Sequence, residues 1–199
     1  DEAAVDSIIK STLPGSFGAK VAYIWKALDG DPGRSHGSYL VKPGDEAVRI
    51  AKRIVDTRQT PIRFTFNNLR RFEDLAGRAG RMFEFDSIAF CKAADTILGA
   101  QGFSPANYSA AVLPDTYEFY WTSPADIIVE KLAFYRKKFW NDERLNKAQK
   151  LGLTPEQVHI LASIVEEESN KSDERPVIAR LYLNRLNKKM FLQADPTVK

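Results

Sequence analysis

Apolar residues recur at helical spacing over most of the chain, with short extended segments between the helical ones. Residues 1–37 contain DEAAVDSIIKSTL and AKVAYIWKAL, whose spacing predicts a helical lead-in. The segment DEAVRIAKRIVDTR predicts a helix with a basic outer face from the spacing of its apolar residues Val48, Ile50, Ala51 and Ile54. From NLRRFEDLAGRAGRM onward, with Asn68 as the expected N-cap, the pattern is mainly helical.

Two segments on either side of the basic helix have the pattern of strands. PIRFTFN alternates strictly, with Ile62, Phe64 and Phe66 on one side and polar residues on the other, which predicts a half-buried strand. GSYLVKPG predicts a second strand that a Pro-Gly turn closes. Strand, helix and strand would form one small unit over residues 38–67, so the expected fold class is α+β.

The composition is that of an ordinary globular protein, with 44% hydrophobic and 28% charged residues. Lys and Arg exceed Asp and Glu by 3, which suits an acidic partner without identifying one. No apolar run approaches the roughly 20 residues of a membrane span. Because the chain opens on Asp1 rather than Met, we expect it to be a piece of a longer protein.

The segment LTPEQVHILASIVEEESN has a clear helix start and ends in three glutamates. Thr154 is the expected N-cap, Pro155 lies in the first turn, and Gln157 completes a capping box. The apolar spacing then predicts a buried face made of Val158, Leu161, Ala162 and Val165.

The three glutamates differ in where this pattern places them. Glu167 points away from the predicted buried face, whereas Glu166 and Glu168 flank it on two sides, roughly 160° apart. Two carboxylates so far apart cannot act on one substrate bond, which excludes the paired carboxylates of an ordinary glycosidase. A carboxylate at the border of an apolar face is partly desolvated and suits a general acid. The pattern itself does not choose between Glu166 and Glu168, and either one has pairing with a lysine as its commoner role.

A second helix, KSDERPVIARLYLNRL, and an extended segment, NKKMFLQADPTVK, follow these glutamates. Together the stretch from Ala162 to Val198 resembles, without a gap, the signature region of the endolytic murein transglycosylases (the MltG or YceG-like family). The resemblance rests on Glu-x-Glu-Ser, on the Glu174–Arg175 pair, on NRL and on LQADPTV. LPDTYEFY at 113–120 is similar to another family segment, and the unit over residues 38–67 lies where the family has a LysM-like module.

The resemblance implies that Glu166 is the catalytic acid and then base of a lytic transglycosylase. Such an enzyme cleaves the bond between N-acetylmuramic acid and N-acetylglucosamine without water and leaves a 1,6-anhydro end. The substrate supplies its own nucleophile, so one carboxylate is enough. The implied substrate-binding residues are Gln193, Asp195, Asn184 and Tyr117. Glu168 and Arg175 would either orient Glu166 or form a structural ion pair with each other. The alternative role of Asp195 is to form a turn, and the alternative role of Tyr117 is to pack in the core.

Two positions depart from the family pattern, and both lie near the end of the chain. Lys189 stands where the family commonly has a glycine, so a backbone needing positive φ would be strained there. Ala194 lacks the hydroxyl of the usual Ser or Thr. The resemblance also implies that the catalytic domain continues past Lys199. The expected division is a lead-in over 1–37, the LysM-like unit with flanking helices over 38–108, and a mainly helical, truncated catalytic domain over 109–199.

By resemblance, the protein would act outside the cytoplasm, held in the inner membrane by one N-terminal anchor that lies outside this chain. Its partners would be peptidoglycan glycan strands and the penicillin-binding synthases, with no cofactor. A rival hypothesis is a non-catalytic glycan-binding module. We expect no nucleic-acid partner, because the arginine of PIRFTFN lies on the face opposite its aromatics. No metal is expected either, because His36 and His159 lie far apart in sequence.

Overall fold

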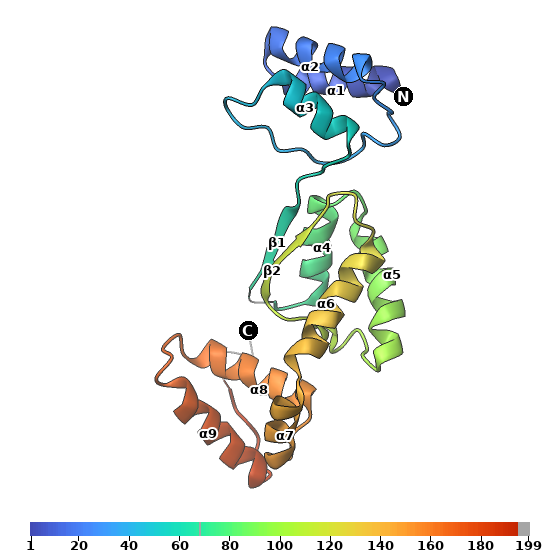
Figure 1. Cartoon of the computed structure of the whole chain (residues 1–199). Coiled ribbons are helices and arrows are strands. Elements are labelled where there is room, and N and C mark those ends of the chain that lie inside the picture. The colour runs from blue at the N-terminus through green and yellow to red at the C-terminus, as the bar shows by residue number, and fades with distance from the viewer. Residues whose placement is uncertain (68, 195–199) are drawn as a thin grey trace. The chain divides into compact units, whose positions relative to one another are not determined.

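The computed structural model describes residues 1–67 and 69–194 (Figure 1). Its helices are α1 (Glu2–Thr12), α2 (Gly15–Ala27), α3 (Ala47–Val55), α4 (Phe72–Met82), α5 (Ser87–Ile97), α6 (Ala125–Phe139), α7 (Asp142–Lys150), α8 (Pro155–Glu168) and α9 (Arg175–Asn187). The strands are β1 (Ile62–Phe66) and β2 (Asp115–Phe119), and two 3-10 turns are η1 (Gly99–Gln101) and η2 (Tyr108–Ala111).

The chain forms two compact units, each made of separate stretches of sequence. The first unit combines Asp1–Ala93 with Pro114–Ile128, and the second combines Ala94–Leu113 with Val129–Lys199. The boundaries expected after residues 37 and 108 remain predictions about which segments fold independently.

Helices α1, α2 and α3 share a core around Trp25. The indole of Trp25 is 0% exposed, and its N–H donates a 2.9 Å hydrogen bond to the hydroxyl of the buried Ser35. A buried indole N–H needs such a partner, because leaving it unpaired would cost free energy. Apolar residues at helical spacing complete this core: Ile9, Val21, Ala22, Ala47, Ile50, Ala51 and Ile54. The helical lead-in and the basic helix therefore form where the apolar pattern predicted them, although Val48 is exposed and Ala47 is buried in the core.

Strands β1 and β2 form an antiparallel pair that buries a cluster of aromatic rings. The register pairs Phe64 with Tyr117 and Ile62 with Phe119. Phe66 stacks on Tyr117 with ring centroids 5.7 Å apart, and Phe64 meets the ring of Phe83 edge-on at 5.4 Å. The alternation of IRFTF thus predicted β1 correctly, with its two inner phenylalanines in the core.

The strand expected within GSYLVKPG does not form, and the partner of β1 is β2. Tyr39 and Val41 pack against the α1–α3 core, so the apolar residues of this segment are used without a sheet. Its backbone is held locally instead: Thr60 donates its N–H to the carbonyl of Ser38 at 2.8 Å, and Leu40 donates its N–H to the Thr60 hydroxyl at 3.0 Å. The fold is α+β, helices with a two-stranded sheet, but the LysM-like detail is not confirmed.

No helix in the described part of the chain combines the length and the apolar character that crossing a bilayer requires.

Candidate functional site

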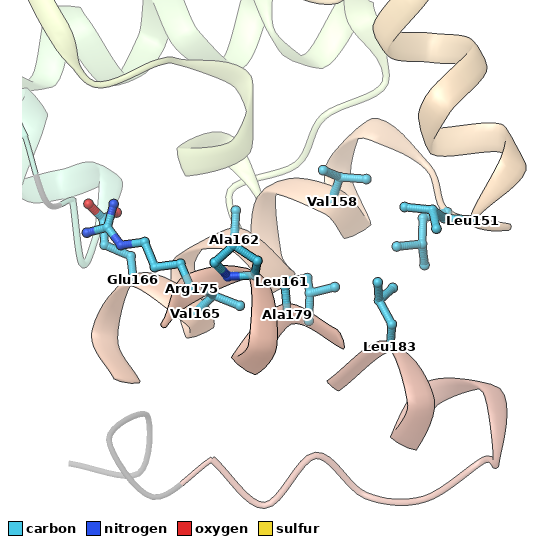
Figure 2. A pocket seen from close by; sticks show the side chains of 11 residues that line it. Leu151, Val158, Leu161, Ala162, Val165, Glu166, Arg175, Ala179 and Leu183 are labelled. Carbon is cyan, nitrogen blue, oxygen red and sulfur yellow. The ribbon is translucent and has the colours of Figure 1, made fainter. Parts of the chain in front are cut away.

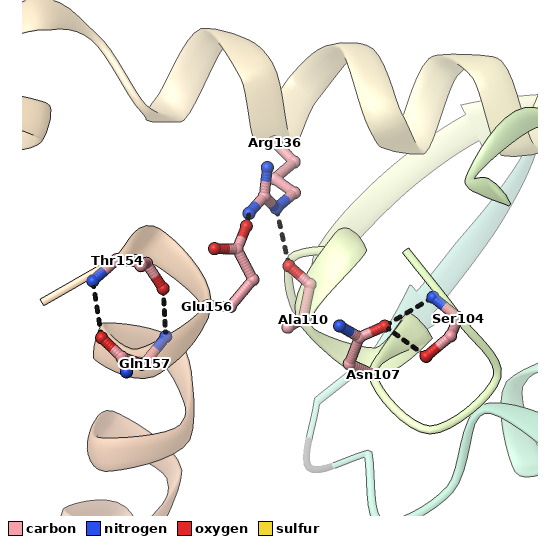
Figure 3. Close-up of polar contacts among 7 residues, drawn as sticks. All are labelled: Ser104, Asn107, Ala110, Arg136, Thr154, Glu156 and Gln157. Atoms are coloured by element: carbon pink, nitrogen blue, oxygen red, sulfur yellow. Dashed lines mark hydrogen bonds and ion pairs between the residues drawn. The ribbon is translucent and has the colours of Figure 1, made fainter. Parts of the chain in front are cut away.

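Helix α8 begins as its sequence predicts. Thr154 donates its N–H to the Gln157 side-chain oxygen at 2.9 Å, and Gln157 returns its own N–H to the Thr154 hydroxyl at 3.2 Å (Figure 3). This reciprocal pair is the capping box, with Pro155 in the first turn. The prediction holds because capping depends only on residues that are neighbours in sequence.

Arg136 of α6 ties the first turn of α8 to η2, all within the second unit. Its Nε donates to the carbonyl of Ala110 at 2.6 Å, and a terminal nitrogen lies 2.6 Å from the Glu156 carboxylate (Figure 3). The guanidinium also lies over the Phe103 ring, 4.6 Å from its centroid. Because its side chain is only 13% exposed, Arg136 has a structural role that a solvated surface charge would not have.

Glu156 is held ionised by these neighbours. Burial raises the pKa of its carboxyl, but its own backbone N–H, the Thr154 side chain and Arg136 together outweigh burial, so its pKa lies below the ordinary value. The start of α8 therefore depends on a charged pair that α6 supplies.

The buried face of α8 is rotated from the predicted one. Leu161, Ile164 and Val165 are buried, whereas Ala162 is exposed. At ~100° per residue, Glu168 then falls about 20° from Leu161, and Glu166 about 140° from it. Glu168 thus lies on the buried face that packs on α9, whereas Glu166 lies outside that face, about 100° from Val165. The predicted flanking of the buried face by both glutamates was wrong.

Glu168 has a structural partner on α9. The buried Tyr182 donates its hydroxyl to the Glu168 carboxylate at 2.5 Å. No ion pair joins Glu168 to Arg175 within residues 69–194, so the ion pair expected between these two is not formed. Arg175 instead donates from Nε to the carbonyl of Ser169 at 3.3 Å.

The Ser and Glu residues of the signature motifs build the turn between α8 and α9. The hydroxyl of Ser169 donates to Glu174 at 2.7 Å and accepts the N–H of Lys171 at 3.0 Å. The ammonium of Lys171 also pairs with Glu174 at 3.0 Å. Hydrogen bonds from Ser169 and Lys171 hold the pKa of the Glu174 carboxyl below its ordinary value. This turn sets where Arg175 enters α9.

A pocket of about 500 Å³ opens between α8 and α9, and we call it the Glu166 pocket. Figure 2 shows Glu166 and Arg175 at one end and Leu151, Val158 and Leu183 at the other. The rest of its lining is apolar: Leu153, Leu161, Ala162, Val165, Pro176 and Ala179. Its size is within the ~300–1,000 Å³ typical of ligand sites, and it has the few polar groups that such sites use for orientation.

The substrate-binding residues predicted beyond α8 lie in varied surroundings. Asn184 is exposed on α9, and the side-chain oxygen of Gln193 accepts a 3.1 Å hydrogen bond from Arg185. Arg185 also donates to the carbonyl of Leu192 at 2.7 Å, which fastens the last described segment alongside α9. Asp195 lies outside the described residues.

Tyr117 and Ala194 are both buried. Tyr117, in the first unit, is 4% exposed and stacks on Phe66, which matches the core-packing alternative. Ala194 lies in a cluster with Leu161 and Tyr182, where the hydroxyl of a Ser or Thr would need its own partner.

Lys189 has the positive φ that the family's glycine implied. Its φ is +56°, directly after α9, and Met190 donates its N–H back to the carbonyl of Arg185 at 2.9 Å. This is the C-terminal motif in which glycine is preferred, because a Cβ strains the left-handed conformation. Gly152 (φ +69°) occupies the equivalent position after α7.

We therefore expect Lys189→Gly to raise the free energy of unfolding by about 1 kcal/mol, because it relieves this strain. Gly152→Ala introduces the same strain and should lower it by about the same amount. Thermal unfolding of the two variants beside the parent checks both signs. A Lys189→Gly variant no more stable than the parent would contradict the strained geometry.

His159 makes stability depend on pH. Burial, helped by the charge of Arg136, lowers the pKa of the imidazole below its ordinary 6.5. The unfolded chain then takes up the proton first as pH falls. The free energy of unfolding is highest above pH 6.5. It decreases below that pH by up to about 1.4 kcal/mol per pH unit, and it levels off once the pH is below the pKa of His159 in the folded protein. His159→Gln should reduce the change in the urea unfolding midpoint between pH 7.5 and pH 5. A midpoint that still depends on pH as strongly as in the parent would contradict this.

The sequence did not predict the Arg136–Glu156 pair or a pocket lined in part by Phe139 and Trp140. Both join residues of α6 or α7 to α8, and no local motif signals such a pairing. In the part of the chain that the structure describes, no group of three or more His, Cys, Asp or Glu side chains is arranged to hold a metal ion.

Comparison with known proteins agrees with the signature motifs. A stretch of 92 residues, 44% of this chain, is 35% identical to a Bacillus subtilis (strain 168) protein named endolytic murein transglycosylase, and the match spans about a quarter (24%) of that relative's length. The crystal structure of a YceG-like protein from Listeria monocytogenes has a TM-score of 0.58 and 17% identity, and the match covers 98% of this chain and 70% of that chain. That likeness supports the fold.

The family predicted from the motifs is confirmed by a family model. The model described as the YceG-like family matches residues 6–199, nearly the whole chain. The chain therefore belongs to the YceG-like family.

Proposed function

We propose that the protein is a lytic transglycosylase that cleaves the N-acetylmuramic acid–N-acetylglucosamine bond of peptidoglycan glycan strands. Membership of the YceG-like family supports this, as does the relative named endolytic murein transglycosylase. The proposed products carry 1,6-anhydro-muramic ends.

The observation that carries the proposal is the position of Glu166. Its side chain is the one carboxylate among the described residues that line the Glu166 pocket, and Arg175 lies at the same end (Figure 2). A hydrolase of the usual kind needs a second carboxylate to act as nucleophile or to activate water. A single carboxylate suits a reaction whose nucleophile belongs to the substrate.

The proposed reaction moves one proton through Glu166. The protonated carboxyl gives its proton to the glycosidic oxygen, and the C1–O bond of the muramic acid breaks as N-acetylglucosamine leaves with a free hydroxyl. The carboxylate then takes the proton of the muramic C6 hydroxyl, whose oxygen bonds to C1. Atoms balance without water, and Glu166 ends protonated as it began.

The other residues of this unit would hold the substrate. The guanidinium of Arg175 offers donors to sugar oxygens beside Glu166. Asn184 and Gln193 present amide groups that can bind hydroxyl or N-acetyl groups, and Asp195 is proposed for the same role. Glu168, fixed by Tyr182, would position the last turn of α8 rather than touch the substrate.

The test is to incubate the purified protein with uncrosslinked glycan strands and to analyse the products by mass spectrometry. We expect 1,6-anhydro-muramic ends, which are lighter than reducing ends by one water. Reducing ends would mean hydrolysis and would overturn the mechanism. Glycan binding without cleavage would overturn the enzymatic function in favour of a binding module.

We also propose that this region acts on the outer side of the inner membrane, beside the penicillin-binding synthases that make its substrate. The support is the substrate itself, since peptidoglycan strands are assembled there. Fractionation of cells, with protease access from the outer side, tests the location.

A further inference from the structure

A second pocket of about 300 Å³, here the Trp140 pocket, lies on α8 beside the Glu166 pocket. Its walls combine the rings of Phe139 and Trp140 with three nitrogen-bearing side chains, Arg144, Lys147 and His159. The remaining walls are aliphatic: Leu113, Ala148, Leu151, Val158 and Ala162. All of these residues belong to the second unit.

The two pockets adjoin each other along α8 and share part of their lining. Leu151, Val158 and Ala162 line both of them. His159 in one pocket and Glu166 in the other are two helical turns apart, about 10 Å along the axis at ~1.5 Å per residue. A ligand longer than one sugar ring that reaches Glu166 in this direction would enter the Trp140 pocket.

The charges of the Trp140 pocket favour an anionic ligand. The Arg144 guanidinium lies over the Phe139 ring, 4.2 Å from its centroid, and donates to the Phe139 carbonyl at 2.8 Å, which fixes its direction. Its remaining donors suit a carboxylate. Lys147 pairs with Glu143, but both side chains are about 70% exposed, so this pair costs little to exchange for another anion.

His159 supplies a different kind of contact. Burial and the nearby Arg136 lower the pKa of its imidazole, so it is neutral near pH 7 and can both donate and accept hydrogen bonds. Hydroxyl groups are the natural partners of a neutral imidazole, and the ring face of Trp140 suits the apolar face of a sugar.

We propose that the Trp140 pocket is a distal glycan subsite, in which Trp140 stacks on a sugar ring and Arg144 with Lys147 binds a carboxylate of the strand. The inference rests on the proposed function, because it assigns the ligand that Glu166 would cleave. The carboxylate is either the lactyl group of muramic acid or a carboxylate of an attached stem peptide. Both share the chemistry that Arg144 recognises, and alternation of carboxylate-bearing and neutral sugars would set the register at Glu166.

Binding is measured by calorimetry, with Glu166→Gln present throughout so that cleavage does not consume the ligand. The probes are a soluble tetrasaccharide of alternating N-acetylglucosamine and muramic acid, the same tetrasaccharide with stem peptides, and an N-acetylglucosamine tetrasaccharide without carboxylates. We expect Trp140→Ala to weaken binding of all three about tenfold, equivalent to about 1.4 kcal/mol. Arg144→Gln should weaken only carboxylate-bearing probes about tenfold, and Arg144→Lys should restore part of that loss.

Matched controls come from the end of α6. Phe134→Ala removes an exposed aromatic and Lys137→Gln an exposed cation, and neither lines the pocket. Both should leave every affinity unchanged. A loss confined to the peptide-bearing probe assigns the carboxylate to the stem peptide. A loss confined to the peptide-free muramic probe assigns it to the lactyl group, which is a free carboxylate there but is an amide in the peptide-bearing probe. A loss shared by both muramic probes means that the pocket accepts either carboxylate.

Tryptophan fluorescence locates the contact independently. The chain has 3 tryptophans, and Trp25 is 0% exposed, so after Trp121→Phe a glycan-dependent change reports Trp140. Unchanged fluorescence, or equal affinity of the parent and Trp140→Ala for all probes, would overturn the subsite. Binding is measured without cleavage, so a negative binding result would not affect the interpretation of the cleavage assay. Likewise, a protein that fails to cleave glycan could still be tested for binding in the Trp140 pocket.

Discussion

Glu166→Gln should reduce the rate of anhydro-end formation by about a thousandfold while the protein stays folded. Glutamine keeps the size of the side chain but can neither donate the proton to the glycosidic oxygen nor accept one from the C6 hydroxyl, and a positioned acid–base group contributes about 10²–10⁴-fold. Glu166 is exposed and packs no core, so the melting temperature should not change. The rate is measured by mass spectrometry of products from uncrosslinked strands, with thermal unfolding beside it.

The neighbouring glutamates are the natural controls. Glu167→Gln, on the solvent side of α8, should retain the parent rate. Glu168→Gln should lose less than Glu166→Gln, because an amide oxygen can still accept the hydroxyl of Tyr182. Should Glu168→Gln abolish cleavage and Glu166→Gln retain it, the assignment of the catalyst would have to move to Glu168.

Trp25→Ala should lower the free energy of unfolding by about 3–5 kcal/mol, the range for truncating a buried aromatic. Trp25 is fully buried among α1, α2 and α3, and Gly30 packs so closely that a Cβ there would lie 2.2 Å from the indole. The truncation leaves a cavity and also deprives the buried Ser35 hydroxyl of its donor. Urea unfolding, followed by circular dichroism, measures the change.

Two variants separate the packing of Trp25 from its hydrogen bond. Trp25→Phe keeps much of the ring volume but removes the N–H, so it should cost less than Trp25→Ala. Tyr23→Ala alters an aromatic that is 74% exposed on the same helix and should change stability by less than about 0.5 kcal/mol. If Trp25→Ala costs no more than Tyr23→Ala, the α1–α3 core is not built around this indole.

Features that depend on neighbouring residues could be predicted from the sequence. The capping box of Thr154 and Gln157 uses four consecutive residues, and both of its hydrogen bonds form. The alternation within β1 reflects two faces of one strand. Positive φ at Lys189 was expected from the glycine that the family commonly has there, and the backbone after α9 does adopt it.

Features that depend on residues far apart in sequence could not be predicted. Nothing in GSYLVKPG shows that β1 would pair with β2 instead, because pairing is decided by segments far apart in sequence. The buried face of α8 was rotated for the same reason: α9, and Tyr182 in particular, selects which side of α8 is covered.

The site was predictable only as far as its motifs reach. Resemblance pointed to Glu166, and its opening into an apolar pocket beside Arg175 is a geometric result. The sequence did not predict the Trp140 pocket, because RKKFW has the pattern of an ordinary basic helix end. Its chemistry arises when α6 and α7 bring their residues to α8.

The pairing of β1 with β2 has a consequence for how the chain is made. As synthesis proceeds from the N-terminus, Phe64 and Phe66 emerge without a partner and wait until Tyr117 and Phe119 follow. During that interval the ribosome-bound chain exposes an unpaired aromatic edge, which chaperones or neighbouring chains can bind. A fragment that ends between the two strands, for example after residue 108, would leave that edge permanently unpaired, so soluble fragments should contain both strands.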